Sequence, residues 1–202
     1  MPRPLSSKPL AGLHEGAFPV FPIVGVDACK GGWISISRDL ATGEISSEVY
    51  SSVENLLDQS ARPVALAIDI PIGMTDSGPR ECDRLARELL GSPRSSSVFP
   101  APIRPALAAN TRKEAHEVSK SIDGRGVGAQ AWGLYARIRE VDRILRAIPF
   151  ARRFIYEVHP EVSFAVWNGG ASLEEPKKSA EGMAIRTGLV DGSFGREVRR
   201  AV

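Results

Sequence analysis

Three short apolar runs in this chain each contain or end in a carboxylate, and this recurrence constrains the fold more than any other feature. The runs are Ile23–Asp27, Val64–Ile70 and Phe154–His159, and their carboxylates are Asp27, Asp69 and Glu157. Runs of this length suit strands, and a continuously apolar one suits a central strand that is covered on both faces. The sequence therefore predicts a sheet whose strands carry acidic groups at or near their ends.

The remaining pattern is that of an α/β protein. Residues 33–37 alternate apolar and polar side chains, and 45–50 follow a turn at Thr42-Gly43, which predicts an antiparallel meander of the first three strands. Helices are expected after the capping patterns at Ser51 and Thr111, from Pro79 to a C-cap at Gly91, and over 130–148, 161–167 and 177–189. A meander followed by helix-linked strands implies an α/β sandwich with a mixed sheet.

Length and composition fit one globular domain behind a short proline-rich segment. Five of the 15 prolines fall within the first 22 of the 202 residues, which predicts a flexible lead-in over 1–19 and a single domain over 20–202. With 43% hydrophobic and 25% charged residues, the chain is not disordered for most of its length. The sequence contains neither the roughly 20 apolar residues of a membrane helix nor an apolar signal segment at its start, so we expect no membrane partner.

The cysteines and the charge give weaker information. Two cysteines make no disulfide framework or zinc cage and favour a reducing cytoplasm. A net charge of +2 does not identify a nucleic-acid partner. Six arginines between residues 137 and 153 either contact a phosphate backbone or form a solvated helix face. The oligomeric state stays open.

The three carboxylates point to metal chemistry if their strands are neighbours. Clustered anions repel one another, and a hard cation such as Mg²⁺ or Mn²⁺ relieves this repulsion through oxygen ligands. Two such ions, about 3.5–4 Å apart, activate water and stabilise the leaving oxygen in phosphodiester cleavage. The alternative is that each carboxylate caps a strand end or pairs with an arginine, since a buried carboxylate needs a partner of some kind.

Seven motifs in order resemble those of the domain of unknown function 429 family. They are Val24-Gly25-Val26-Asp27-Ala28-Cys29-Lys30-Gly31-Gly32-Trp33, Asp69-Ile70-Pro71-Ile72-Gly73, Arg80-x-Cys82-Asp83-x-x-Ala86-Arg87, Ser96-Ser97-Val98-Phe99-Pro100-Ala101-Pro102, Gln130-Ala131-Trp132-Gly133, Ile138-x-Glu140-Val141-Asp142 and Tyr156-Glu157-Val158-His159-Pro160-Glu161-Val162-Ser163-Phe164. Members of that family are predicted to have a ribonuclease H-like fold and are often labelled predicted nucleases. The resemblance runs from about residue 23 to residue 189.

The resemblance implies a five-stranded mixed sheet, with three antiparallel strands followed by two parallel ones. It assigns Asp27 to the first strand, Asp69 to the fourth and Glu157 to the fifth, and it implies that these residues bind the metal. A further acidic residue is expected from an Asp-rich motif in the last helix. Asp191 is the only aspartate after Asp142, so the chain lacks that acidic helix motif.

Other residues within the motifs have two interpretations each. Asp83 and Arg87 stand four residues apart on one helix and form either a surface ion pair or, with Arg80, an active-site rim that holds a phosphate. His159 is either a catalytic base or metal ligand, or a structural group. Ser97 lies in a loop that either binds substrate or only connects two elements.

The leading interpretation is a metal-dependent nuclease or phosphodiesterase that acts on nucleic acid. Its catalytic residues would be Asp27, Asp69, Glu157 and His159, and its substrate-binding residues Lys30, Arg80, Asp83, Ser97 and Gln130. A non-catalytic or degenerate binding domain is the alternative, which the missing acidic motif supports. An actin-like phosphotransferase is a lower alternative, because that fold needs a second domain and a second Gly-rich site.

Overall fold

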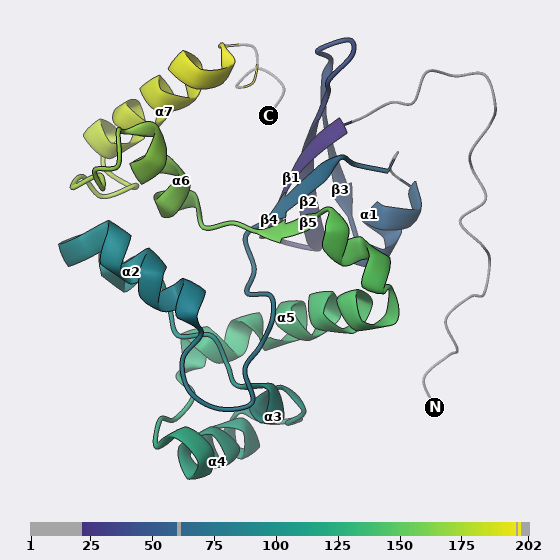
Figure 1. Ribbon diagram of the computed structural model, residues 1–202, viewed down its shortest axis with the longest axis vertical. Coiled ribbons are helices and arrows are strands. Elements are labelled where there is room, and N and C mark those ends of the chain that lie inside the picture. The colour runs from purple at the N-terminus through teal and green to yellow at the C-terminus, as the bar shows by residue number, and fades with distance from the viewer. Residues whose placement is uncertain (1–21, 60–61, 197, 199–202) are drawn as a thin grey trace.

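Five strands form one open mixed sheet in the order β3-β2-β1-β4-β5 (Figure 1). The computed structural model describes residues 22–59, 62–196 and 198. The strands are β1 (Pro22–Cys29), β2 (Gly32–Asp39), β3 (Ile45–Tyr50), β4 (Ala65–Ile68) and β5 (Ile155–Glu157). The β1–β2 and β2–β3 pairs are antiparallel, whereas β1–β4 and β4–β5 are parallel. The predicted α/β class and mixed sheet are confirmed; the predicted lead-in, residues 1–19, lies outside the described residues.

Seven α-helices and two 3₁₀ turns are found in the described part of the chain. The helices are α1 (Val53–Gln59), α2 (Glu81–Arg94), α3 (Arg104–Leu107), α4 (Arg112–Asp123), α5 (Ala129–Ala147), α6 (Pro160–Trp167) and α7 (Ala180–Phe194); the turns are η1 (Ser95–Ser97) and η2 (Pro149–Arg153). The short helix α3 was not predicted, because it is a single turn inside a proline-rich loop. Helix α7 lies about three to five residues later than the predicted 177–189.

Two predicted helix starts are wrong by one or two residues. Ser52, not Ser51, caps α1, because its hydroxyl accepts the backbone N–H of Asn55 at 3.0 Å. Helix α2 begins at Glu81, so Pro79 lies before the helix and not at its first position. In both places the sequence pattern identified the right helix, and only the local backbone decided which residue caps it.

Two other predicted helix boundaries are confirmed. The hydroxyl of Thr111 caps α4 by accepting the backbone N–H of Glu114 at 3.2 Å. Gly91 has a φ of 59° inside α2, where the regular helix breaks before its last short segment. That left-handed backbone conformation favours glycine, so the predicted C-cap at Gly91 is correct.

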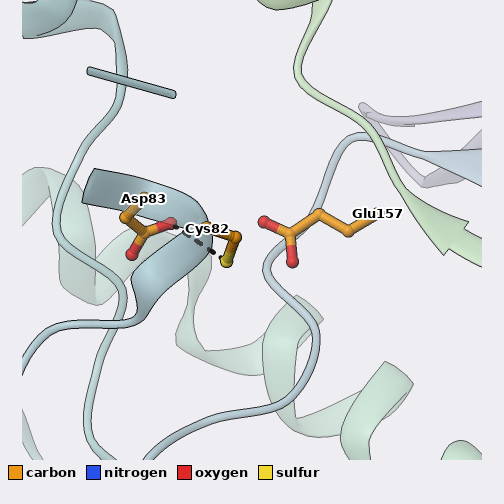
Figure 2. A group of neighbouring side chains, drawn as sticks. All are labelled: Cys82, Asp83 and Glu157. Carbon is orange, nitrogen blue, oxygen red and sulfur yellow. Dashed lines mark hydrogen bonds between the residues drawn. The ribbon is translucent and has the colours of Figure 1, made fainter. Parts of the chain in front are cut away.

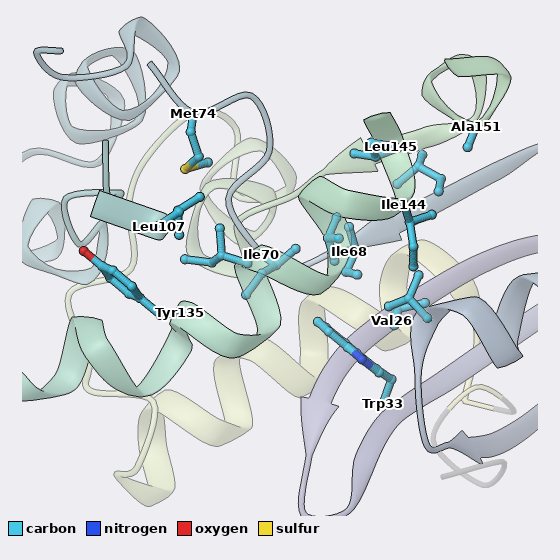
Figure 3. Close-up of a cluster of buried hydrophobic side chains, with 14 of the residues drawn as sticks. Val26, Trp33, Ile68, Ile70, Met74, Leu107, Tyr135, Ile144, Leu145 and Ala151 are labelled. Carbon is cyan, nitrogen blue, oxygen red and sulfur yellow. The ribbon is translucent and has the colours of Figure 1, made fainter. Parts of the chain in front are cut away.

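One face of the sheet packs against α1 and α5 to form the main core (Figure 3). Alternate residues of β1 and β4 point into this core, since successive side chains of a strand lie on opposite faces. Val26 and Ile68, which are register partners on these strands, meet Ile144 and Leu145 of α5 there. The residues that follow them, Asp27 and Asp69, therefore lie near the other face.

Glu140 of α5 ties two elements from the N-terminal half to that core. Trp33 of β2 is fully buried, and its indole Nε1 donates to both carboxylate oxygens of Glu140 at 3.1 Å. The same carboxylate accepts the backbone N–H of Val53, the first residue of α1, at 2.6 Å. Next to the tryptophan, Gly32 leaves no room for a side chain, because a Cβ there would overlap the carbonyl oxygen of Tyr50. Trp33 and Glu140, which lie in two of the quoted motifs, thus hold β2, α1 and α5 together.

A second, smaller cluster joins α2, η1 and α6. It contains Leu90, Val98 and Ala165. Figure 1 shows α2, α6 and α7 together on one side of the sheet, beyond the ends of β4 and β5. A buried ion pair holds α7 on α6, because Arg186 donates to both carboxylate oxygens of Glu161 at 3.1 and 2.7 Å. These helices place further side chains near the strand ends that carry the predicted site.

Two observations bear on the predicted environment of the chain. Within the described residues, no helix is both long and apolar enough to span a bilayer. Cys29 and Cys82 are both free thiols.

Candidate functional site

Asp27 and Asp69 stand at adjacent ends of two parallel strands. Val26 and Ile68 are register partners, and the backbone N–H of Asp69 donates to the carbonyl of Val26 at 3.1 Å. Asp27 is exposed, whereas Asp69 is partly buried. The sequence prediction that these two carboxylates neighbour one another is confirmed, because parallel strands bring their carboxyl ends to the same edge of a sheet.

The electrostatics of this edge centre on Asp69. Burial raises the pKa of the Asp69 carboxyl, and the negative charge of Asp27 raises it further. His159 and Lys177 act in the opposite direction on this pKa, and Glu157 adds a weaker upward contribution. The negative charges of Asp27 and Asp69 repel each other at this partly buried edge. A divalent cation that binds between them is therefore favourable.

Glu157 ends β5, but its carboxylate is engaged elsewhere. Its Oε2 accepts the backbone N–H of Ile72 at 2.7 Å and the Arg80 Nη1 at 2.6 Å, and its Oε1 accepts the Arg80 Nη2 at 2.8 Å. Two hydrogen bonds from one guanidinium satisfy the charge of Glu157. The interpretation in which a carboxylate pairs with an arginine therefore holds for Glu157 in this structure.

Arg80 and Asp83 are buried, so they do not form the surface ion pair that was one expectation from the sequence; a role for Arg80 at an active-site rim stays a prediction. Arg80 Nε donates to Asp83 Oδ2 at 3.1 Å, its Nη2 also contacts Asp83, and its Nη1 donates to the carbonyl of Ile72 at 2.8 Å. Burial disfavours the charged guanidinium, but the hydrogen bonds to Glu157 and Asp83 outweigh it and raise the pKa of Arg80. The predicted Asp83–Arg87 pair is wrong, since Arg87 donates to the carbonyl of Val98.

One set of three potential metal ligands is found among the described residues, and it does not fit a metal ion. Atoms of Cys82, Asp83 and Glu157 lie within 4.8 Å of one another (Figure 2). However, Arg80 already supplies the positive charge that these two carboxylates need. Burial also raises the pKa of the Cys82 thiol, which disfavours the thiolate that binds metals. We therefore assign this set to the Arg80 ion-pair network.

His159 lies two residues beyond Glu157 and precedes the first residue of α6. Its Nε2 is 3.2 Å from the carbonyl oxygen of Ser97. Because a carbonyl only accepts, Nε2 carries the proton in a neutral ring and Nδ1 is left as an acceptor. Nδ1 is buried, and no group in the described part of the chain donates to it. His159 acts electrostatically on Asp69 but does not form a compact ligand set with it.

The side chains of the remaining predicted substrate residues, Lys30, Ser97 and Gln130, form no hydrogen bond with Arg80, Asp83 or Glu157 among the described residues. The hydroxyl of Ser97 donates to the carbonyl of Arg94 within the turn η1, so the side chain is used locally. Lys30 is exposed in the turn after β1, close in sequence to Asp27. Gln130 is exposed in the first turn of α5.

The arginine-rich segment makes mostly intramolecular contacts. Five of its arginines contact carbonyls or carboxylates of the chain itself: the partners are Cys29, Ala109, Leu145, Glu54 and Asp142. The sixth, Arg153, stacks on the ring of Phe150 with 5.4 Å to the centroid. Within the described residues, each arginine of this segment therefore has a contact in the chain itself, although Arg143 and Arg146 remain largely exposed.

Lys177 is the residue that sequence reasoning missed. It lies between α6 and α7, 108 positions beyond Asp69 in the sequence, yet it lowers the pKa of that carboxyl. No ion pair joins Lys177 to another described residue. In the sequence, the segment Lys177-Lys178-Ser179 is typical of a polar helix start. The proximity of Lys177 to Asp69 could be recognised only from the folded arrangement of α6 and α7.

Comparison with known proteins places the chain in one family. Neither a curated protein nor a solved structure matches it. The family model DUF429, described as a protein of unknown function, matches residues 25–201. The match includes β1 from Gly25 onward, the whole of the acidic edge, and α7. The chain therefore belongs to the DUF429 family.

Proposed function

We propose that this protein is a divalent-metal-dependent phosphodiesterase whose metal lies at the Asp27–Asp69 edge. The observation that supports this proposal most is the pair of carboxylates at adjacent parallel strand ends, one of them partly buried with a raised pKa. Mg²⁺ keeps several of its waters and is commonly held by one or two carboxylates together with substrate phosphate oxygens. A two-carboxylate edge is therefore sufficient, and Glu157 is not needed as a direct ligand.

In this proposal the residues of the chain divide the work between them. Asp27 and Asp69 would hold Mg²⁺ or Mn²⁺, which when bound supplies a Lewis acid and an activated water. Glu157, fixed by Arg80 and by the N–H of Ile72, keeps the end of β5 and the segment after β4 together. His159, which acts electrostatically on Asp69, would serve as the proton acceptor in this proposal. Nucleic acid is the proposed substrate class, in a reducing cytoplasm.

The proposal is tested by metal binding and cleavage in the same protein. We expect saturable Mn²⁺ binding by the full chain, and cleavage of a nucleic acid only when the divalent metal is present. Asp27→Asn should abolish both, whereas Asp58→Asn, which changes an exposed carboxylate of α1, should abolish neither. Cleavage in the presence of a chelator, or unchanged cleavage by the Asp27 variant, contradicts the proposal.

A non-catalytic binding domain is the second candidate function. It is favoured by one specific observation, the complete pairing of Glu157 with Arg80, which removes one of the three carboxylates expected to hold metal. Absence of saturable Mn²⁺ binding would support this second candidate and exclude the first. Mn²⁺ binding that Asp27→Asn removes, without cleavage of any nucleic acid tested, would also favour it.

A further inference from the structure

Three exposed arginines lie together at the amino ends of β4 and β5. Arg62 precedes β4, and Arg152 and Arg153 end the turn η2, just before β5. The two strands are parallel neighbours, and the backbone N–H of Leu66 donates to the carbonyl of Phe154 at 2.6 Å, so the segments before them meet at one edge of the sheet. The four residues of β4, each with a rise of about 3.3 Å, separate this edge from the acidic edge.

The ring of Phe150 holds two of these guanidiniums in place. The Cζ atom of Arg62 lies 4.1 Å from the centroid of this ring, and that of Arg153 lies 5.4 Å from it. The Arg62 Cζ also lies 5.8 Å from the ring centroid of Phe154. A guanidinium above a ring uses its flat face, so the N–H groups around its edge stay available as donors. The rings therefore fix the positions of two positive charges without neutralising them.

The positive charge at this surface is not compensated by nearby carboxylates. Within the described part of the chain, no carboxylate forms an ion pair with Arg62, Arg152 or Arg153. The Nε of Arg152 donates to the carbonyl of Leu145 at 3.0 Å, which orients this side chain. Guanidiniums that are held in place with free donors are suited to bind closely spaced anions such as phosphates.

An exposed aromatic ring adjoins these arginines. Tyr156 lies in the edge strand β5 with 52% of its surface exposed, and its hydroxyl donates to the carbonyl of Arg153 at 3.0 Å. Its register partner on β4 is the small residue Ala67. Unlike the ring of Phe150, the ring of Tyr156 makes no aromatic or cation–π contact with another described residue. Its face is therefore open to a flat ligand, and its hydrogen-bonded hydroxyl fixes how the ring is presented.

The combination of fixed guanidiniums with an open aromatic ring favours single-stranded nucleic acid as the ligand. Proteins that bind single strands combine a positively charged surface, which follows the phosphate backbone, with aromatic side chains on which the bases stack. An acidic peptide would satisfy the arginines but would leave the ring of Tyr156 unused. A membrane surface is usually bound by the apolar face of an amphipathic helix, whereas this surface is built from a five-residue 3₁₀ turn and two strand ends.

We propose that this surface binds single-stranded nucleic acid. Arg62, Arg152 and Arg153 contact phosphates of the backbone, and a base stacks on Tyr156. The inference goes beyond the proposed function, because this surface lies at the opposite ends of the strands from the acidic edge and needs no metal. It holds a strand at one end of the sheet independently of any cleavage at the other end.

The test is fluorescence anisotropy of the full chain with a labelled oligouridylate of about 12 nucleotides, in the presence of EDTA. We expect saturable binding that weakens as the salt concentration rises, because each neutralised phosphate releases counterions. Arg62→Gln and Arg153→Gln should each weaken binding and reduce the slope of log affinity against log salt by about 0.7, the value for one phosphate on a single strand. Arg62→Lys should keep the slope, and Arg112→Gln, which changes an exposed arginine of α4, should alter neither quantity.

The stacked base is tested separately through Tyr156. Tyr156→Ala should weaken binding at least about fivefold, the lower end of what one base stacked on an aromatic ring contributes, and should leave the salt dependence unchanged. Tyr156→Phe keeps the ring and should retain most of the affinity. A duplex of the same length should bind more weakly, because its bases are stacked on one another and do not reach the ring. Urea unfolding midpoints equal to that of the unmodified chain exclude loss of folding as the cause.

Several results would overturn the inference. They are equal losses of affinity in Arg62→Gln and Arg112→Gln, a Tyr156→Ala variant that binds as tightly as the unmodified chain, binding to phosphatidylserine vesicles in place of the oligonucleotide, and equally tight binding of an oligoglutamate of the same charge. Binding in EDTA through these residues, without metal-dependent cleavage, would contradict only the proposed function. Metal-dependent cleavage by a chain that shows no such binding would contradict only this inference.

Discussion

Replacing Arg80 by methionine removes the one positive charge found, among the described residues, in the hydrogen-bonded network of Arg80, Asp83 and Glu157. Arg80 and Asp83 are each 5% exposed, and Glu157 has 29% of its side-chain surface exposed. In the variant, Asp83 is left buried without its cation, and Ile72 loses the guanidinium contact to its carbonyl. Removing one partner of a buried ion pair typically costs about 3–5 kcal/mol of the free energy of unfolding.

The expected loss for Arg80→Met is at the lower end of that range, about 3 kcal/mol. The part of the network that involves Glu157 is partly screened by solvent, so it contributes less than the fully buried Asp83 pair. Urea unfolding followed by tryptophan fluorescence measures this loss. The matched control is Arg84→Met on the same helix, whose ion pairs with Glu81 and Glu88 are exposed, and its unfolding midpoint should not change.

A double variant separates the buried charge from the lost packing. Arg80→Met combined with Asp83→Ala removes the unpaired carboxylate, so it should be more stable than Arg80→Met alone. A destabilisation of Arg80→Met below about 1 kcal/mol, or a double variant less stable than the single one, would refute the reasoning that the network is held by charge compensation.

Two further predictions concern the β2–β3 region. Gly32→Ala should lower the free energy of unfolding by about 1–3 kcal/mol, because its Cβ overlaps the backbone of Tyr50; Gly25→Ala, which has open space around it, should change little in the same urea experiment. Burial and a hydrogen bond to Glu48 raise the pKa of Tyr50 to about 12 from 10.0. The neutral phenol is therefore favoured in the folded state, and its stabilisation is complete below pH 10 and is lost as the pH rises from 10 toward 12. Ultraviolet titration of tyrosinate should show a late phase that Tyr50→Phe removes, and a wild-type titration without that phase would contradict the assignment.

The order and type of the sheet elements could be predicted because they depend on local sequence patterns. Apolar runs such as Val64–Ile70 predict buried strands, and their linkage by helices predicts parallel pairing. Because parallel strands end at one edge, the proximity of Asp27 and Asp69 followed from topology alone. Single-turn elements such as α3 carry too few residues for a periodic pattern, so no window on the sequence reveals them.

The partners of individual side chains at the site did not follow from the sequence. Glu157 and Arg80 are 77 residues apart, and nothing in either neighbourhood indicates that the guanidinium is buried against that carboxylate. The position of Lys177 depends on how α7 docks on α6, which is set by the Arg186–Glu161 pair. Long-range ion pairs of this kind are determined by packing, and only the folded chain shows which of several possible carboxylates each arginine selects.

The contacts of the Glu140 carboxylate also mean that the N-terminal half cannot form all of its stabilising interactions until Glu140 has been synthesised. The indole of Trp33 can form its hydrogen bond only after Glu140, 107 residues later, has been synthesised. The first N–H of α1 depends on the same carboxylate, which lies 87 residues later in the sequence. Because these contacts close long loops, the β1–β2–β3 meander leaves the ribosome with a large indole uncovered and a helix start uncapped. We therefore expect this half of the chain to depend on chaperones until α5 has emerged, and to aggregate when it is expressed without α5.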